Sequence, residues 1–333
     1  MKYVPLGATG LYVSQLTLGA MTFDHQDGTF GARIGGTGQD LATRMVDLSI
    51  EAGVNLFDTA NNYGMGQSEI ILGKALGSRR KDVLVATKFT TQVGEGPNAG
   101  GSSRLAMIRE CENSLQRLGT DWIDLYQVHS FDETTPLEET LRGLDQLVQQ
   151  GKVRYAGVSN YAAWQLAKAD GICRQLGLER CCSVQAYYSL VGRELEREII
   201  PASIDLGLGI LVWSPLAGGF LTGKYSGADA VGGRRAQLAL PPVDEERGHD
   251  IVDVAREIAD AHGTSVAQVS LAWLLHKPGV TSVIVGARTE EQLTGNLGTV
   301  DLDLSTDDMA RLDKASSLKP EYPGWAPPMF RRN

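Results

Sequence analysis

The chain has 333 residues, of which 42% are hydrophobic and 21% are charged, and its formal net charge is −9. This composition is typical of a soluble globular protein with a large core, and the length suits a single α/β barrel with insertions. The acidic surplus argues against a nucleic-acid partner, because binding a phosphate backbone requires a basic surface.

Signals for a membrane, a secretory pathway or a metal are missing from the sequence pattern. Residues 1–21 alternate apolar and polar side chains, and no stretch approaches the length of a membrane span. The four cysteines, Cys111, Cys173, Cys181 and Cys182, match no zinc spacing, and the adjacent pair is a poor disulfide former. We therefore expect reduced thiols, a cytoplasmic protein, no membrane contact and no metal.

In chain order, a hairpin-like unit comes first, within residues 1–15, with strands at Tyr3–Leu6 and Tyr12–Ser14. Short apolar runs then alternate with helical patterns. Eight of these runs are predicted to be strands: Leu16–Leu18, Leu56–Asp58, Val83–Thr87, Ile123–Val128, Tyr155–Val158, Ser183–Ala186, Ile210–Trp213 and Ser282–Val285. Strands that alternate with helices indicate a parallel sheet, and eight such units predict a closed (β/α)8 barrel.

The predicted helices lie between these strands. A helix around Leu41–Ala52 ends before Gly53, and a capping box from Thr135 to Glu138, with Pro136 at the first helical position, opens another that ends at Gly151. Further helices are predicted at Arg104–Leu118, Ala162–Leu176, Leu195–Leu206, Val266–His276 and Glu290–Leu297, with two additional ones at Ile251–His262 and Thr306–Ser317. Glycine- or proline-rich loops at Asp24–Gly38, Val93–Ser102 and Ser226–Pro242, with the tail 319–333, are expected around the barrel mouth of a single domain, 1–333.

Polar side chains follow the ends of consecutive predicted strands. Asp58 ends the second strand, with Tyr63 five residues later, while Lys88 follows the third strand and His129 the fourth. Because the active sites of α/β barrels lie at the carboxyl ends of the strands, these side chains are expected to meet. Taken singly, Asp58 could be a turn residue, and Tyr63 and His129 could serve only packing or hydrogen bonding. Lys88 is harder to explain in this way, since an apolar strand is a poor place for a solvated lysine.

Together these residue types suit the protonation of an oxygen atom on which negative charge is building. A tyrosine hydroxyl has an unperturbed pKa of about 10, and a nearby ammonium group favours the phenolate and lowers that pKa. Lys88 needs a carboxylate partner to stay charged, and Asp58 can supply one. His129 could orient a carbonyl oxygen or share its proton. Tyr63 is therefore predicted to be the general acid.

The segment from Asp58 to Gly64, Asp-Thr-Ala-Asn-Asn-Tyr-Gly, followed by Gln67-Ser68-Glu69 and Leu72-Gly73, resembles the signature of the aldo-keto reductases. The match continues in the same order with Lys88, Val128-His129, Gly157-Val158-Ser159-Asn160 and Trp213-Ser214-Pro215-Leu216, and it spans about Leu6 to Leu318. The potassium-channel β subunits and bacterial sugar- and aldehyde-handling members are the most similar in style. The resemblance implies reduction of an aldehyde or ketone with NADPH, or the reverse oxidation, with Asp58, Tyr63, Lys88 and His129 as the catalytic tetrad.

The resemblance also implies that NADPH or NADP+ lies extended across the barrel mouth, without a Rossmann fold. Ser159, Asn160 and Gln185 would hold the nicotinamide carboxamide, and Trp213 would stack on the ring. The pyrophosphate contacts implied are Ser214, Leu216, Gly218 and Lys224, with Arg235 closing over it from a loop, and Pro215 is a further implied cofactor contact. The residues implied to bind the adenosine end are Gly286, Arg288, Gln292 and Asn296. The remaining implied cofactor contacts are Gly19, Ala20, Met21 and Asp58.

Arg288 favours NADPH over NADH, because a guanidinium group binds phosphate with paired donors. The alternative is a solvated arginine at the start of the helix near Thr289. Gly295 departs from the family pattern, which often has an acidic residue before the asparagine that matches Asn296, so NADH use stays open. An apolar, aromatic-friendly substrate pocket is indicated by Met21, Phe89, Trp213, Tyr322, Trp325 and Phe330, although packing explains several of these residues equally well.

Three other interpretations compete with a barrel reductase. Gly36-Thr-Gly38 precedes a helix and Asp58 lies 20 residues further on, as in a Rossmann fold, but Leu41 occupies the third glycine position. A metal-dependent hydrolase using Asp58 and His129 is disfavoured, since the chain has five histidines and no His-x-His at a strand end. An NADPH-binding regulatory module with slow or vestigial turnover is the main alternative. The substrate, the physiological direction and the oligomeric state are not predicted.

Overall fold

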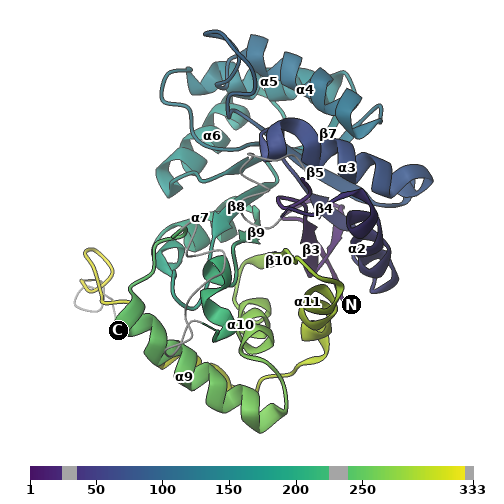
Figure 1. Ribbon diagram of the computed structural model, residues 1–333. Helices are drawn as coiled ribbons and strands as arrows, with labels where there is room; N and C mark the ends of the chain where they lie inside the picture. The colour runs from purple at the N-terminus through teal and green to yellow at the C-terminus, as the bar shows by residue number, and fades with distance from the viewer. Residues whose placement is uncertain (25–35, 225–238, 327–333) are drawn as a thin grey trace.

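A computed structural model describes residues 1–24, 36–224 and 239–326. Within them, eight parallel strands close into a barrel in the order β10-β3-β4-β5-β6-β7-β8-β9, which confirms the predicted fold. The strands are β3 (Leu16–Gly19), β4 (Leu56–Asp58), β5 (Leu84–Phe89), β6 (Ile123–Val128), β7 (Val153–Ser159), β8 (Ser183–Tyr187), β9 (Gly209–Trp213) and β10 (Val280–Val285). Helices surround the strands (Figure 1), so the barrel wall is covered on its outside.

Among the described residues, each barrel strand is followed by a helix of the surrounding layer. These helices are α2 (Gln39–Glu51), α3 (Gln67–Leu76), α4 (Arg104–Leu118), α5 (Leu137–Gln149), α6 (Ala163–Leu176), α7 (Ile199–Leu206), α10 (Val266–Leu275) and α11 (Glu290–Leu297). The two additional helices are also present, as α9 (Glu245–His262) and α12 (Thr306–Ala315), and α9 packs against both α10 and α12. Figure 1 shows α9 along the outer edge of the molecule.

The N-terminal hairpin closes one end of the barrel. Its strands, β1 (Tyr3–Pro5) and β2 (Tyr12–Ser14), are antiparallel, and Leu6 and Val13 are fully buried in one cluster with side chains from the barrel strands. Gly7 has a φ of +59°, and a Cβ there would lie 2.4 Å from the Cys182 carbonyl oxygen. Since Cys182 directly precedes β8, the hairpin covers the amino ends of the strands. The carboxyl ends remain as the mouth.

Two helix predictions differ from the structure, and one helix is missing from the prediction. The helix predicted at Leu195–Leu206 is divided into a 3-10 turn, Glu194–Glu196, and α7. Pro201 has no N–H to donate, so it is accommodated in the first turn of a helix that begins at Ile199. The expected capping box at α5 does not form, because the Thr135 hydroxyl donates instead to Asp132 and Pro136 is the N-cap residue. Helix α3 is not predicted from the sequence pattern, since Gly73 weakens the helical signal in its interior.

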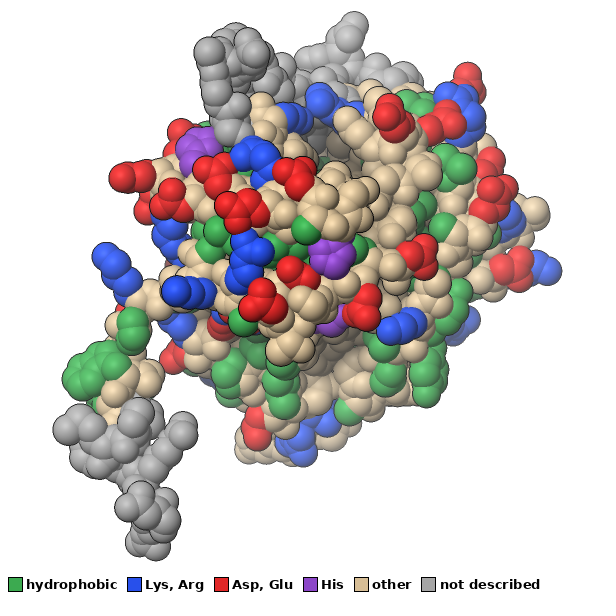
Figure 2. Space-filling model, turned by 90° about the horizontal axis from the view of Figure 1, so that it is seen from below, with side chains coloured by type: hydrophobic (Ala, Val, Ile, Leu, Met, Phe, Trp, Pro, Cys, Tyr) green, Lys and Arg blue, Asp and Glu red, His purple; other side chains and the backbone are tan. Residues whose placement is uncertain are grey.

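The surface carries charges of both signs. Figure 2 shows Lys and Arg side chains interspersed with Asp and Glu on the face seen from below, with no uniformly basic area on it. Among the described helices, none is both long and apolar enough to cross a membrane. All four cysteines are free thiols, and burial raises the pKa of Cys111 to about 12, which makes that thiol a poor nucleophile.

Candidate active site

The structure brings Asp58, Tyr63, Lys88 and His129 together at the carboxyl ends of β4, β5 and β6. The Lys88 side chain is fully buried, and its Nζ lies 2.5 Å from Asp58 Oδ1 and 3.4 Å from the Tyr63 hydroxyl oxygen. A further hydrogen bond of 2.8 Å joins Nζ to the Thr59 carbonyl oxygen. The rings of Tyr63 and His129 meet edge to face, with centroids 5.8 Å apart.

Lys88 lies within β5, where the sequence places it just beyond the strand. Its backbone is paired with Gln127 of β6, and the strand continues to Phe89. The strand continues through a charged residue because the ammonium group finds its ion-pair partner within hydrogen-bonding distance. A buried lysine without that partner would carry a large desolvation cost.

Asp58 is the central acceptor of the site. Besides Lys88, it accepts hydrogen bonds at Oδ2 from Gln185 Nε2 at 2.8 Å and from Gln127 Nε2 at 3.3 Å. Burial alone lowers the pKa of the Lys88 ammonium, but its attraction to Asp58 and Tyr63 outweighs burial, so this pKa stands above its ordinary value. Lys88 therefore stays a cation at neutral pH, directly beside the phenol.

His129 is neutral at physiological pH. Burial, followed by repulsion from the Lys88 cation, lowers the pKa of His129 to about 3. Its Nδ1 is buried and has no hydrogen-bond partner among the described residues, and its carbonyl oxygen accepts from Asn160 Nδ2 at 2.9 Å. A neutral imidazole can donate one hydrogen bond to an oxygen placed between it and Tyr63 without adding a positive charge.

Tyr63 sits on a loop with an unusual backbone. The loop opens the 3-10 turn Tyr63–Gly66, in which Gly64, Met65 and Gly66 have φ values of 55°, 53° and 95°. For a non-glycine residue such as Met65, this left-handed conformation is strained and persists only where the surroundings hold it in place. The Asn61 N–H donates to the Lys88 carbonyl oxygen at 3.0 Å, which ties the loop to β5.

The residues implied for the nicotinamide lie together at the ends of β7, β8 and β9. Trp213 Nε1 donates to Asn160 Oδ1 at 3.0 Å, and the hydroxyl of Ser159 donates to the Gln185 carbonyl oxygen at 3.0 Å. Asn160 is exposed and has a φ of 57°, while Trp213 is half-buried and packs on Tyr187, with ring centroids 5.2 Å apart. One N–H of the Gln185 amide is already bonded to Asp58, so its oxygen and its second N–H are the groups that could serve a ligand.

The turn after β9 is folded on itself. Ser214 has a φ of 51°, its carbonyl oxygen accepts from the Ala217 N–H, and its hydroxyl accepts from the Gly218 N–H at 3.2 Å. Pro215 is buried and Leu216 is half-buried in this turn, and the exposed Lys224 lies at its far end. Arg235, the remaining residue implied for the pyrophosphate, lies outside the described residues.

Arg288 is exposed beside the start of α11 and forms no salt bridge within the described part of the chain. Its backbone N–H donates to Gln292 Oε1 at 3.0 Å, while Thr289 caps the helix. Asn296 is buried and donates to the Gly286 carbonyl oxygen at 3.3 Å, so it holds the turn after β10. The first barrel strand, β3, contributes Gly19, which is paired with Asp58 of β4. Ala20 and Met21 directly follow this strand.

Several residues predicted to line an aromatic substrate pocket pack in other parts of the described structure. Phe89 is fully buried and stacks on Tyr126 with ring centroids 4.8 Å apart, so it is a core residue. Tyr322 and Trp325 are exposed and pack on each other, and Phe330 lies outside the described residues. Conversely, Gln127 contacts Asp58 but is not predicted as a site residue. Its position two residues before His129, on the same face of β6, is the signal that points to it.

The donor set fits a nicotinamide dinucleotide. Two buried polar atoms, His129 Nδ1 and Gln127 Oε1, have no partner in the described part of the chain and lie close to Tyr63 and Asp58. The Trp213 indole and the Asn160 amide stand together at the mouth. Two exposed cations, Lys224 and Arg288, follow β9 and β10 further along the rim. The amide, the flat ring and then the cations follow one another in the same order as the carboxamide, the aromatic base and the phosphates of a nicotinamide dinucleotide.

A phenol held beside a buried ammonium group, at the carboxyl ends of barrel strands, is suited to moving protons to and from oxygen. Comparison with known proteins gives the family: the model of the aldo/keto reductase family matches residues 15–317. The chain therefore belongs to this family of oxidoreductases, which act on carbonyl groups and generally use NAD(P)H.

Three relatives cover nearly the whole chain. An uncharacterized oxidoreductase, YrpG, of Bacillus subtilis (strain 168) is 37% identical over 94% of this chain and 95% of its own. A probable voltage-gated potassium channel subunit beta of Oryza sativa subsp. japonica is 36% identical, covering 91% and 92%. The versiconal hemiacetal acetate reductase of Aspergillus parasiticus is 31% identical, covering 97% and 99%.

Proposed function

We propose that this protein is an NADP(H)-dependent reductase of an aldehyde or ketone, which can also run in the oxidative direction, with Tyr63 as the general acid and base. The observation that carries the proposal is the position of the Lys88 ammonium, 3.4 Å from the Tyr63 hydroxyl and 2.5 Å from Asp58. A cation held in that place stabilises the phenolate that remains after proton donation.

In this mechanism the protein binds, orients and protonates. Asn160, Ser159 and Gln185 would hold the carboxamide of the nicotinamide, and Trp213 would cover the ring. A nicotinamide held there would supply the hydride for the carbonyl carbon. The neutral His129 orients the carbonyl oxygen toward Tyr63, which donates its proton as negative charge develops there. Lys88 stabilises the phenolate, and Asp58 keeps Lys88 charged and in place.

The choice of NADP(H) over NAD(H) is supported by Arg288, an exposed guanidinium at the β10 end of the mouth. Such a group can bind a ribose phosphate with two parallel hydrogen bonds. We further propose that the protein works in the cytoplasm on a small-molecule substrate and contacts neither nucleic acid nor membrane. The net charge of −9 supports the absence of a nucleic-acid partner.

The test is turnover of NADPH with a panel of aldehydes and ketones, followed by nicotinamide absorbance, for the wild type and Tyr63→Phe. The phenyl ring keeps the shape of the site but cannot give a proton, so kcat is expected to fall by about a hundredfold or more while NADPH still binds. Reduction should be fastest at mildly acidic to neutral pH and oxidation at alkaline pH, because Tyr63 must be protonated for one and ionised for the other. Unchanged turnover in Tyr63→Phe would disprove this role.

A second candidate function is an NADPH-binding regulatory subunit with slow or vestigial turnover. It is favoured by the similarity to two proteins named as probable voltage-gated potassium channel subunits beta, 36% and 34% identical. The same assay separates the two: tight NADPH binding with no turnover on any carbonyl, or on any alcohol in reverse, would favour the regulatory subunit.

A further inference from the structure

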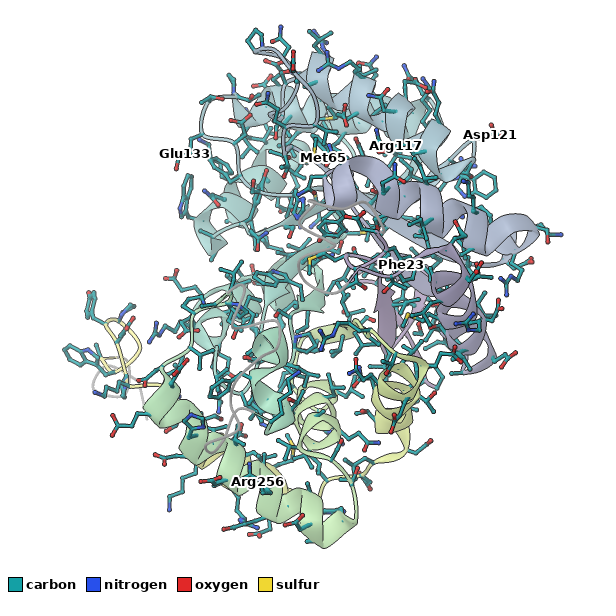
Figure 3. The ribbon with its side chains drawn as sticks, viewed as in Figure 1. Phe23, Met65, Arg117, Asp121, Glu133 and Arg256 are labelled. Carbon is teal, nitrogen blue, oxygen red and sulfur yellow. The ribbon has the colours of Figure 1, made fainter. Side chains whose placement is uncertain are left out.

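A buried network of charged side chains lies between α3, α4 and the Tyr63 loop. Glu69, in the first turn of α3, is fully buried, and Glu110 of α4 is 3% exposed. Between them stands Arg117, in the last turn of α4, whose Nε donates to Glu69 Oε2 at 2.5 Å and whose Nη2 lies 3.7 Å from Glu110 Oε2. Figure 3 shows Arg117 between the two helices, on the same side as Met65.

Each carboxylate of this network reaches a neighbour of the proposed catalytic residues. Glu69 Oε1 accepts from the hydroxyl of Thr87 at 2.6 Å, and Thr87 directly precedes Lys88. Glu110 Oε2 accepts from Asn61 Nδ2 at 3.0 Å, and Asn61 lies two residues before Tyr63. The network therefore connects the strand that carries the ammonium group with the loop that carries the phenol.

Arg117 also contacts the other end of that loop directly. A Cβ built on Gly66 would lie 2.7 Å from Arg117 Cδ, so the stem of the arginine packs against the backbone there. The three residues that follow Tyr63 are all left-handed, and a backbone of this kind needs surrounding contacts to persist. Glu110 thus holds Asn61, before Tyr63, and Arg117 holds Gly66, after Tyr63, so both ends of the loop contact the same network.

We propose that Arg117 is a positioning residue for proton transfer, which, with Glu69 and Glu110, holds the Tyr63 hydroxyl beside the Lys88 ammonium. The inference rests on the proposed function, in which Tyr63 is the general acid. An arginine suits this place because its planar fork can serve two carboxylates at once, whereas a lysine presents a single point of charge. Arg117 itself acts through the loop and the strand, not on the substrate.

The first test compares Arg117→Met and Arg117→Lys with the wild type. The matched control is Arg142→Met, which removes an arginine from an Arg–Glu pair that is about half exposed, with side chains 48% and 54% accessible. A misplaced phenol should lower kcat about ten- to a hundredfold in Arg117→Met, less in Arg117→Lys, and not at all in the control. The dissociation constant of NADPH, measured by fluorescence titration, should stay unchanged.

The second test does not depend on turnover. With 3-fluorotyrosine at position 63, the fluorine resonance reports ionisation of that phenol. Among the described residues, its charged and titratable neighbours are Lys88, Asp58 and His129, and the buried Asp24 packs against the next residue, Gly64. In Arg117→Met the midpoint is expected to rise by about one pH unit, because the phenol moves away from Lys88. A purely structural role would lower the thermal stability and leave both the midpoint and kcat unchanged.

A folded Arg117→Met protein with the wild-type fluorine midpoint and wild-type kcat would overturn the proposal. Should that variant fail to fold, Asn61→Ala removes the link from Glu110 to the loop, together with a hydrogen bond of 3.3 Å to the Thr91 carbonyl oxygen. It must raise the same midpoint, and an unchanged midpoint would equally overturn the proposal. If the wild type reduces no carbonyl compound, the proposed function fails, and the fluorine titration still decides whether Arg117 positions Tyr63.

Discussion

Removing the charge of Lys88 should destabilise the protein through the carboxylate it leaves behind. Asp58 is 3% exposed, so Lys88→Met leaves a buried anion without its cation. The loss of one partner from a buried ion pair costs about 3–5 kcal/mol. Gln127 and Gln185 continue to donate to Asp58 Oδ2, which places the expected loss in unfolding free energy at the lower end, about 3 kcal/mol.

The companion substitution reveals the cause of that loss. In Lys88→Met/Asp58→Asn neither charge remains, and exchanging a buried pair for neutral groups is often close to neutral. The double variant is therefore expected within about 1 kcal/mol of the wild type, so Asp58→Asn should restore about 2 kcal/mol to Lys88→Met. A second substitution that stabilises the first is not expected from simple loss of packing.

Urea denaturation followed by circular dichroism measures these differences, provided that the slope of the transition is the same in each variant. The exposed pair Arg142–Glu138 serves as the control, since replacing both of its members should change the unfolding free energy by only about 0.5 kcal/mol or less. The reasoning is refuted if Asp58→Asn adds its own loss to that of Lys88→Met. Because the assay measures unfolding alone, the result does not depend on identifying a substrate.

Other substitutions give further tests. The pKa of His129 is about 3 in the folded protein, so between about pH 6.5 and pH 3 this side chain is protonated only in the unfolded chain. The unfolding free energy should therefore fall by about 1–2 kcal/mol between about pH 7 and pH 5. His129→Gln should lack this contribution to the pH dependence. Arg288→Ala should raise KM for NADPH severalfold but leave KM for NADH unchanged; equal effects would contradict phosphate binding. Gly73→Ala should destabilise by about 2 kcal/mol, because its Cβ would lie 2.3 Å from the Leu118 carbonyl oxygen. Gly171→Ala, in open space on α6, should instead stabilise by about 0.5–1 kcal/mol; similar effects of both would refute the argument.

The barrel and its mouth could be predicted from the sequence because their signals are local. Apolar runs such as Ile123–Val128 and helical stripes such as Arg104–Leu118 have the same bounds in the structure as in the prediction. The rule that polar strand-end residues share one rim then places Asp58, Tyr63 and His129 together without any knowledge of distances.

What could not be predicted depends on contacts between segments distant in the chain. Nothing near Arg117 indicates that it will meet Glu69, 48 residues away. Lys88 is expected beyond its strand, since only the folded barrel brings Asp58 close enough to make a buried lysine tolerable. Phe89 is a plausible pocket residue until the pleat of β5 turns it toward Tyr126.

The hairpin formed by β1 and β2 has a consequence for handling the protein. Leu6 and Val13 are buried among the barrel strands, and Met1 lies beside Gly53, shortly before β4, so residue 1 stands at the end of the barrel opposite Tyr63. A fluorophore or a solid support attached there would leave the approach to the phenol clear, so tethered molecules should turn over as fast as free ones. Removing the hairpin, in contrast, would expose the barrel interior to water at the amino ends of the strands.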